Sequence, residues 1–333
     1  MKPRVALFEA FSGMGSLTRA LTDGLSGHAE VRIAGCAELD DRYLQHWTHE
    51  HPEASTFLGS VSRYHPAELS LPCPGEHRIF VAGIPCTGTS LAGRAKNGLA
   101  TPEEHARVGH LFLTVAHWIR LHRPDTVIFE NVALYPKTLS ARCLRSALRA
   151  AGYSLYERTL NAYKEFGTPS ERVRWVMVAT RAGQFQWNPV AQPFTGQLTA
   201  YLDAPSALDE AESFSPARVA AQSAYCARKA AEGCGFAQRL IDHSSTKCPT
   251  ICSSYGKIQP SATYVRTASS YRMLRPREIA RLHGFPDDFR LPASKTTAYQ
   301  VLGQGVCYRP FFALGAALGQ HLAIGAQPFA LVA

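Results

Sequence analysis

No uninterrupted apolar run in the 333-residue sequence approaches the roughly 20 residues that a membrane-spanning helix needs. The first four residues precede only a short apolar stretch, so we expect no secretory signal. The nine cysteines are odd in number and show no repeated spacing, which disfavours a disulfide framework and indicates a reducing compartment. With 46% hydrophobic residues, the chain is expected to fold as one large domain or two smaller ones.

Lysine is also scarce, because only 8 of the 35 cationic side chains are lysines and 27 are arginines. Arginine presents a planar group that can bind phosphate through two hydrogen bonds, and the formal net charge is +9. A GC-rich genome produces the same arginine bias without selection for binding. The charge alone therefore does not decide between nucleic-acid binding and genome composition.

What the sequence does contain is an alternation of apolar strand patterns and helical patterns. Strands are expected at 5–8, 31–37, 78–82 and 125–129, and helices at 17–25, 42–51 and 111–121. This alternation predicts an α/β fold with a doubly wound, mostly parallel, Rossmann-like sheet. Ligands of such sheets bind beyond the carboxyl ends of the strands, so the informative residues are those that directly follow a strand.

The composition changes after a last strand at 174–178, where Gln, Pro, Ala, Ser and Gly replace the regular patterns. We therefore predict two domains. A large lobe comprises 1–182 plus 294–333 and includes an apolar helix at 311–322, and a smaller, irregular lobe with the hinge comprises 183–293.

Two features follow the first two strands. The Gly13-x-Gly15 turn permits close backbone approach of a nucleotide, since glycine lacks a Cβ and a helix N-terminus supplies free amides. Glu38 ends the second strand, where a carboxylate in such folds can accept hydrogen bonds from both ribose hydroxyls. Together they indicate a cofactor that carries a nucleoside. A tight turn beside a solvated glutamate is the alternative.

Residues with catalytic chemistry follow the later strands. Cys86 comes after the third strand, where an exposed thiolate is a strong nucleophile, although a buried structural cysteine is the alternative. Glu130 ends the next strand and can exchange a proton with an electron-poor ring, or instead form a helix cap with Asn131. Arg172 and Arg174 open the last strand on one face, about 7 Å apart, where they could clamp an anion or a carbonyl oxygen, or remain solvated.

No metal site is expected, although Cys226, Cys234, Cys248 and Cys252 with His243 resemble a set of zinc ligands. The segment from Cys248 to Cys252 looks extended. That conformation separates the two sulfur atoms by about 13 Å, too far for one tetrahedral ion.

Several motifs, taken in order along the chain, resemble those of the cytosine-5 DNA methyltransferase family. The resemblance covers roughly 1–180 and 270–325, with a variable region between them. It rests on Phe11-Ser12-Gly13-Met14-Gly15, Glu38, Pro85-Cys86, Glu130-Asn131-Val132, Arg172-x-Arg174, Arg272-x-Leu274-x-Pro276-Arg277-Glu278, Gly284-Phe285-Pro286 and Gly303-x-Gly305-Val306. So many motifs in one order are specific to the family.

The resemblance implies transfer of a methyl group from S-adenosylmethionine to carbon 5 of cytosine in a specific duplex sequence. In the family, the cysteine equivalent to Cys86 bonds to ring carbon 6, and the glutamate equivalent to Glu130 binds and protonates ring N3. The target base must rotate out of the duplex, because its ring atoms are shielded within the stack. Arg172 and Arg174 would help to hold the flipped base.

The resemblance also assigns cofactor contacts. Phe11 would stack on the adenine, Leu39 would line its other side, and Glu38 would bind the ribose. The full implied set is Phe11, Ser12, Gly13, Gly15, Glu38, Leu39, Ser60, Pro85, Gln304 and Val306. The chain departs from the family's usual residues at Glu9, Ser16, Ser60, Thr87, Ser170 and Gln304, and two of these, Ser60 and Gln304, belong to the implied cofactor pocket.

The family further implies a monomeric bacterial or phage-type enzyme that acts on double-stranded DNA in the cytoplasm, associated with the nucleoid and without membrane contact. The smaller lobe would read the target sequence, and a cognate restriction endonuclease acting on the same site is an implied partner. Two alternatives stay open. One is a transfer-RNA cytosine-5 methyltransferase, whose reduced second lobe and distinctive residue pair after the cysteine are not evident. The other is a non-catalytic DNA-binding relative, which Ser60 and Gln304 motivate.

Overall fold

The computed structural model of this chain describes residues 2–63, 75–85, 89, 98–233, 238–260 and 262–325. Contacts divide the chain into two compact units. The first unit comprises 1–160, 173–189 and 310–333, and the second comprises 161–172 and 190–309.

This division differs from the predicted lobes at 161–172, 183–189 and 294–309. Long-range contacts account for two of the differences. The backbone amide of Glu171 donates to Cys248 O at 2.8 Å, which joins residues 161–172 to the second unit. The helix α10 (Lys295–Gln304) packs on α9 (Pro276–Leu282), which joins residues 294–309 to the second unit.

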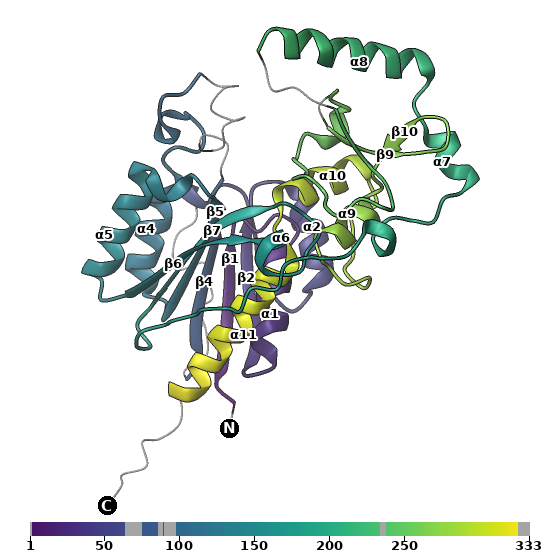
Figure 1. The fold of residues 1–333 in the computed structure, drawn as a ribbon. Coiled ribbons are helices and arrows are strands. Elements are labelled where there is room, and N and C mark those ends of the chain that lie inside the picture. The colour runs from purple at the N-terminus through teal and green to yellow at the C-terminus, as the bar shows by residue number, and fades with distance from the viewer. Residues whose placement is uncertain are drawn as a thin grey trace, which may run out of the picture. The chain divides into compact units, whose positions relative to one another are not determined.

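The first unit is built on a seven-stranded sheet in the order β3-β2-β1-β4-β5-β7-β6 (Figure 1). Its strands are β1 (Arg4–Ala10), β2 (Glu30–Glu38), β3 (Ser55–Leu58), β4 (His77–Gly83), β5 (Thr126–Val132), β6 (Ser154–Asn161) and β7 (Val173–Thr180). β1 to β5 pair in parallel, and β7 is antiparallel to β5. The predicted α/β class with a doubly wound, mostly parallel sheet is confirmed. The strand order reverses between β1 and β4, where ligands of such sheets bind.

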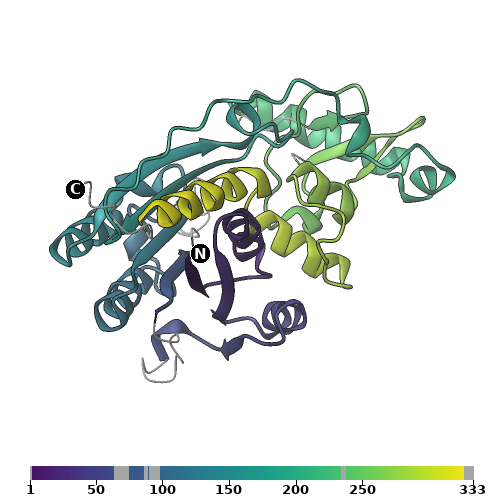
Figure 2. The ribbon, with the colours of Figure 1, turned by 90° about the horizontal axis from the view of Figure 1, so that it is seen from below.

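Helices cover both faces of this sheet. They are α1 (Ser16–Ser26), α2 (Asp41–Glu50), α4 (Leu111–His122), α5 (Leu139–Ala150) and α11 (Tyr308–Gly325). α4 and α5 lie on one face, whereas α1 and α11 lie on the other (Figure 1, Figure 2). α1 and α11 approach so closely that a Cβ on Gly24 would lie 2.1 Å from the carbonyl oxygen of Phe312.

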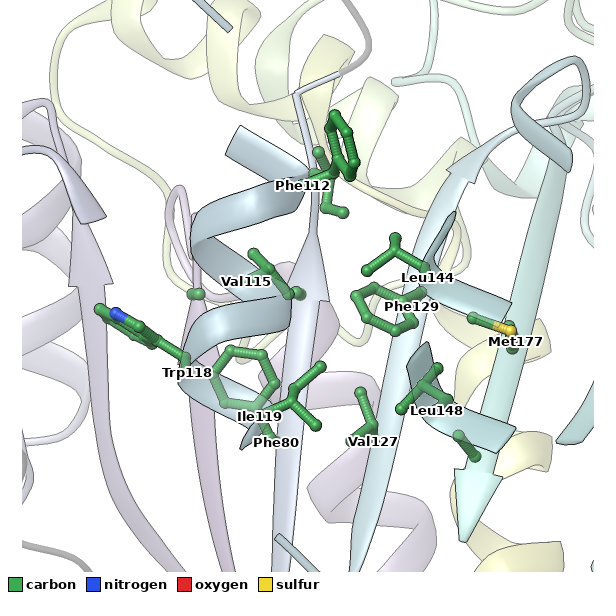
Figure 3. Close-up of a cluster of buried hydrophobic side chains, with 14 of the residues drawn as sticks. Phe80, Phe112, Val115, Trp118, Ile119, Val127, Phe129, Leu144, Leu148 and Met177 are labelled. Carbon is green, nitrogen blue, oxygen red and sulfur yellow. The ribbon is translucent and has the colours of Figure 1, made fainter. Parts of the chain in front are cut away.

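The alternation of side chains along the strands separates the two faces. Strand residues such as Val127, Phe129 and Met177 belong to a buried cluster with side chains of α4 and α5 (Figure 3). The intervening residues point to the opposite face of the sheet, because successive strand side chains alternate. Glu130 and Arg174 are therefore turned away from this cluster, at the ends of β5 and β7 that lie beside each other.

The second unit combines helices with a three-stranded sheet in the order β10-β9-β8, in which β9 is parallel to β8 and antiparallel to β10. Besides α9 and α10, its elements are α6 (Ala162–Glu165), α7 (Ala207–Glu212), α8 (Pro216–Ala231), β8 (Arg239–Ile241), β9 (Thr263–Arg266) and β10 (Tyr271–Met273). In the part of the chain that the structure describes, no helix is both long and apolar enough to cross a membrane.

Candidate active site

The turn after β1 depends on two glycines and one strained residue. Gly13 and Gly15 have φ values of 55° and 81°, in the left-handed region that favours glycine. A Cβ on Gly15 would also lie 2.8 Å from Cδ1 of Trp47, so a side chain does not fit there. Phe11 has a φ of 60°, which is costly for a bulky residue. Strain of this kind is typical of ligand-binding sites.

The same turn orients the carboxylate of Glu38. This group accepts hydrogen bonds from the backbone amides of Gly13 at 2.8 Å, Leu39 at 2.8 Å and Asp40 at 2.9 Å. Burial raises the pKa of Glu38 above its ordinary value, although the three hydrogen bonds oppose the shift. The carboxyl group is therefore fixed in place at the end of β2, where it can accept hydrogen bonds from the hydroxyls of a ligand.

Most of the predicted cofactor residues of the first unit follow β1, β2 and β3. The backbone amide of Gly59 donates to Glu38 O at 2.8 Å, which brings Ser60 close to the end of β2. The Leu39 side chain is 59% exposed, and Ser60 Oγ lies 2.7 Å from Ser62 Oγ. The residues that the structure gathers at these strand ends are Phe11, Ser12, Gly13, Gly15, Glu38, Leu39 and Ser60.

Two further predicted cofactor contacts, Gln304 and Val306, belong to the second unit. Gln304 is exposed at the end of α10, and Val306 is buried. A Cβ on Gly303 would lie 2.3 Å from the carbonyl carbon of Cys252, so the backbone before Gln304 packs tightly within this unit. Their contact with the cofactor stays a prediction.

An ion pair joins the ends of β5 and β7. Arg174 Nε lies 2.9 Å from Glu130 Oε1, and the two side chains are 14% and 12% exposed. Arg174 Nη1 also donates to its neighbour Val173 O at 2.8 Å. The antiparallel register, which pairs Val132 with Arg174, brings these residues together. The carboxyl group is thus held in a defined orientation without being closed off from solvent.

Glu130 also lies beside the end of β4. Gly83 pairs with Glu130 in the sheet, and a Cβ on Gly83 would lie 3.6 Å from Glu130 Oε2. Asn131 Nδ2 donates to Ile84 O at 2.9 Å, which holds the backbone as it leaves the strand. This structural role for Asn131 differs from the helix cap considered for it. Pro85, the next residue, is half-buried.

Cys86 and Thr87 of the predicted catalytic segment lie outside the described residues. The chain reaches Cys86 three residues beyond Gly83, whose neighbour across the sheet is Glu130. The prediction that the thiol faces the glutamate therefore remains a prediction.

That the Arg172 and Arg174 side chains share one strand face stays a prediction. β7 begins at Val173, and Arg172 belongs to the second unit. Arg172 is only 2% exposed, and its guanidinium group donates to the carbonyl oxygens of Ile251 at 3.1 Å and Gly303 at 2.9 Å, and also to those of residues 304 and 305. The Arg172 guanidinium group therefore binds carbonyl oxygens of the second unit, one of the two ligand types considered for it, and is not solvated.

Glu9 was recognised in the sequence only as a departure from the family pattern. It is 2% exposed, and the hydroxyl of Thr18 donates a hydrogen bond to its carboxylate. Burial raises the pKa of Glu9 to about 8, with hydrogen bonds from Thr18 opposing the shift and the charges of Glu38 and Glu130 adding to it. An acidic residue inside an apolar strand pattern was the available signal.

Comparison with known proteins agrees with this geometry. The family model described as C-5 cytosine-specific DNA methylase matches residues 5–320. The Type II methyltransferase M.NlaX of Neisseria lactamica is 28% identical over 305 residues, which cover 90% of this chain and 92% of that protein. The Type II methyltransferase M.HpaII of Haemophilus parainfluenzae is 26% identical over 265 residues, covering 73% of this chain and 72% of that protein.

Solved structures show the same fold. The methyltransferase EhMeth of Entamoeba histolytica superposes with a TM-score of 0.75 at 18% identity, covering 96% of this chain and 99% of that one. The Dnmt2 methyltransferase of S. pombe gives a TM-score of 0.72 at 15% identity, covering 97% and 100%.

Proposed function

Because this chain belongs to the C-5 cytosine-specific DNA methylase family, we propose that it methylates a flipped cytosine of duplex DNA through a transient bond to Cys86. Family membership makes it a DNA (cytosine-5)-methyltransferase, and enzymes of this family depend on S-adenosylmethionine. The proposal concerns which residues perform each step. The observation that carries it is the Glu130–Arg174 ion pair beside the strand that leads to Cys86.

Cytosine carbon 5 is a poor nucleophile and must be activated first. In the proposed step, the Cys86 thiolate forms a bond to ring carbon 6, and the ring electrons move so that carbon 5 becomes nucleophilic. Glu130 shares a proton with ring N3, which stabilises the added electron pair. After carbon 5 gains the methyl group, a base removes its proton and the bond to sulfur breaks, which restores both the aromatic ring and the thiolate.

Arg174 acts in this scheme as a positioning residue. Its guanidinium group holds one carboxylate oxygen of Glu130 at 2.9 Å, so the carboxyl group is oriented before a base arrives. Arg172 is omitted from base binding, because its guanidinium group is buried against backbone carbonyls.

The residues at the ends of β1, β2 and β3 fit S-adenosylmethionine, which supplies the methyl group as a sulfonium. The glycine turn admits a ligand close to the backbone, since Gly13 and Gly15 need positive φ and Gly15 has no room for a Cβ. Glu38 offers an oriented carboxylate to the ribose hydroxyls. The residues that we propose hold the cofactor are Phe11, Ser12, Gly13, Gly15, Glu38, Leu39, Ser60, Pro85, Gln304 and Val306.

The second unit is proposed to read the target sequence of double-stranded DNA, with the protein acting as a monomer. Its relatives M.NlaX and M.HpaII are named Type II methyltransferases, which supports a restriction endonuclease of the same specificity as a functional partner. Digestion of DNA from an expressing host with methylation-sensitive nucleases would reveal the sequence.

Transfer of tritium from labelled S-adenosylmethionine to duplex DNA tests the proposal. We expect Cys86→Ser to abolish transfer, whereas Cys143→Ser, which removes an exposed thiol on α5, should retain it. Duplex DNA that contains 5-fluorocytosine should become covalently attached to the wild-type protein only. Labelling of transfer RNA instead of DNA would identify the alternative enzyme, and transfer by the Cys86→Ser variant would refute the mechanism.

A further inference from the structure

The helix α8 lies at the outer margin of the second unit (Figure 1). One of its faces is fixed to that unit, because Gln222 and Cys226 are buried and Gln222 Oε1 accepts a hydrogen bond from Tyr271 Oη at 2.7 Å. Near its beginning, the Arg218 guanidinium lies 4.9 Å from the ring centre of Phe214, and that ring packs on Tyr271. The helix is therefore held in a fixed orientation through one face.

The charges of α8 have one sign. Between 216 and 231 the helix contains Arg218, Arg228 and Lys229 and no acidic residue. Helical spacing places Arg218 and Lys229 eleven residues, or three turns, apart on one edge, with Arg228 beside them on the outward side. Glu232, just beyond the helix, lies 2.5 Å from Lys229 and 4.0 Å from Arg228, so it offsets part of this charge. The helix retains a basic edge about 16 Å long.

The outward face of α8 carries little except short side chains. Its exposed residues there are Ala217, Ala220, Ala221, Ala224 and Ala227. A protein partner is usually held by large, exposed aromatic or aliphatic anchors. The aromatic side chain of α8, Tyr225, is half-buried, and the Arg228 guanidinium lies 5.3 Å from its ring centre. Short side chains beside a basic edge instead allow a bulky, evenly charged polymer to approach the helix. Duplex DNA has this chemistry, with one phosphate for about every 3.4 Å of each strand.

We propose that α8 lies along the phosphate backbone of duplex DNA and that Arg218, Arg228 and Lys229 bind its phosphates. This inference rests on the proposed function, because it takes DNA as the substrate. It assigns to α8 a contribution to affinity that does not depend on sequence, separate from the base contacts that choose the target. Arg218 is held over the Phe214 ring and is exposed, so its guanidinium group is presented in one orientation.

Binding of a labelled duplex of arbitrary sequence, measured against salt concentration, tests this assignment. The variant Arg218→Ala/Arg228→Ala should bind the duplex roughly tenfold to hundredfold more weakly at about 0.1 M salt, and the slope of log K against log salt should become shallower by about two. The variant Arg218→Lys/Arg228→Lys keeps the charge and should retain most of the affinity. Binding of S-adenosylmethionine should be unchanged in both.

A matched control separates position from net charge. Arg142 and Arg149 are exposed on α5 in the first unit, so Arg142→Ala/Arg149→Ala removes the same charge elsewhere. An equal loss of affinity in this control, or no loss in the α8 variant, would overturn the inference. So would weaker binding of transfer RNA by the α8 variant with duplex binding intact. Methyl transfer by the wild-type protein is scored separately, so failure of the proposed function is recognised independently.

Discussion

In the second unit Glu278 is completely buried against the guanidinium group of Arg272, whereas in the first unit Glu9 is buried to 2% exposure against the hydroxyl of Thr18. Arg272 bonds to both oxygens of Glu278 at 2.8 Å and to Asp209 at 2.6 Å. Burial alone would raise the pKa of Asp209, but a backbone amide and two arginines hold it below its usual range. The second unit thus neutralises its buried acids.

The first unit instead gathers carboxyl groups with less compensation. The pKa values of Glu9 and Glu38 are both raised by burial, and Glu130 adds to the effect on Glu9. A cationic ligand such as a sulfonium cofactor would favour the ionised forms of these acids, because a nearby opposite charge lowers the pKa of a carboxyl group. Buried ion pairs in the second unit therefore support folding, whereas the buried carboxyl groups of the first unit belong to the candidate active site.

Replacement of Glu130 should give the largest effect. We expect Glu130→Gln to lower methyl transfer by about 10³-fold, because the amide cannot share a proton with the base, while thermal stability stays near that of the wild type. The control is Glu157→Gln, which breaks a comparable ion pair with Arg145 in the same unit. Equal activity of the two variants would show that Glu130 is structural.

Removal of the Glu278 carboxyl group tests whether the buried ion pair of the second unit supports folding. Glu278→Ala should destabilise the second unit by about 3–5 kcal/mol, because Arg272 would keep a buried charge without its main partner. Urea unfolding measures this change. Glu212→Ala, which removes a partner of Arg275 that is 31% exposed, should cost about 1 kcal/mol or less. Similar losses in both variants would contradict the distinction between buried and accessible pairs.

Arg174→Lys should have a smaller effect on activity than Glu130→Gln. Lysine keeps the charge but lacks the planar group that orients the carboxyl group of Glu130, so kcat should fall by about 10- to 100-fold. Because Arg174 is a positioning residue, KM for DNA should change little. A change confined to KM would assign Arg174 to substrate binding instead.

The last prediction concerns Glu9 and the pH dependence of stability. Since its pKa is raised from 4.5 to about 8 in the folded protein, the folded state binds more protons than the unfolded state between these values. Stability should therefore fall as pH rises through this window, by at most about 1.4 kcal/mol per pH unit, and the contribution should be gone above pH 8. In Glu9→Gln, Tm should depend less on pH over the same window. An unchanged profile would show that Glu9 is already ionised.

The fold class and most of the first-unit site could be predicted from local patterns. Glu38 and Glu130 were recognisable because each ends an apolar strand, and Gly13 and Gly15 because a turn between strand and helix requires them. The individual partners of Arg172 could not be predicted, because alternation in the sequence shows neither where a strand begins nor which distant carbonyl groups a side chain meets. The same limit applies to the unit boundaries, which depend on packing between α9 and α10.

By itself, the order of motifs along the chain determined the family, the sheet and the residue types that do the chemistry, because strand periodicity and reactive side chains are local properties. Only the tertiary structure decided that Arg174 meets Glu130, that Arg172 serves the backbone near Gly303, and that Glu9 is buried. These outcomes depend on contacts between residues that are distant along the chain, and on the desolvation of charges, which no local pattern encodes.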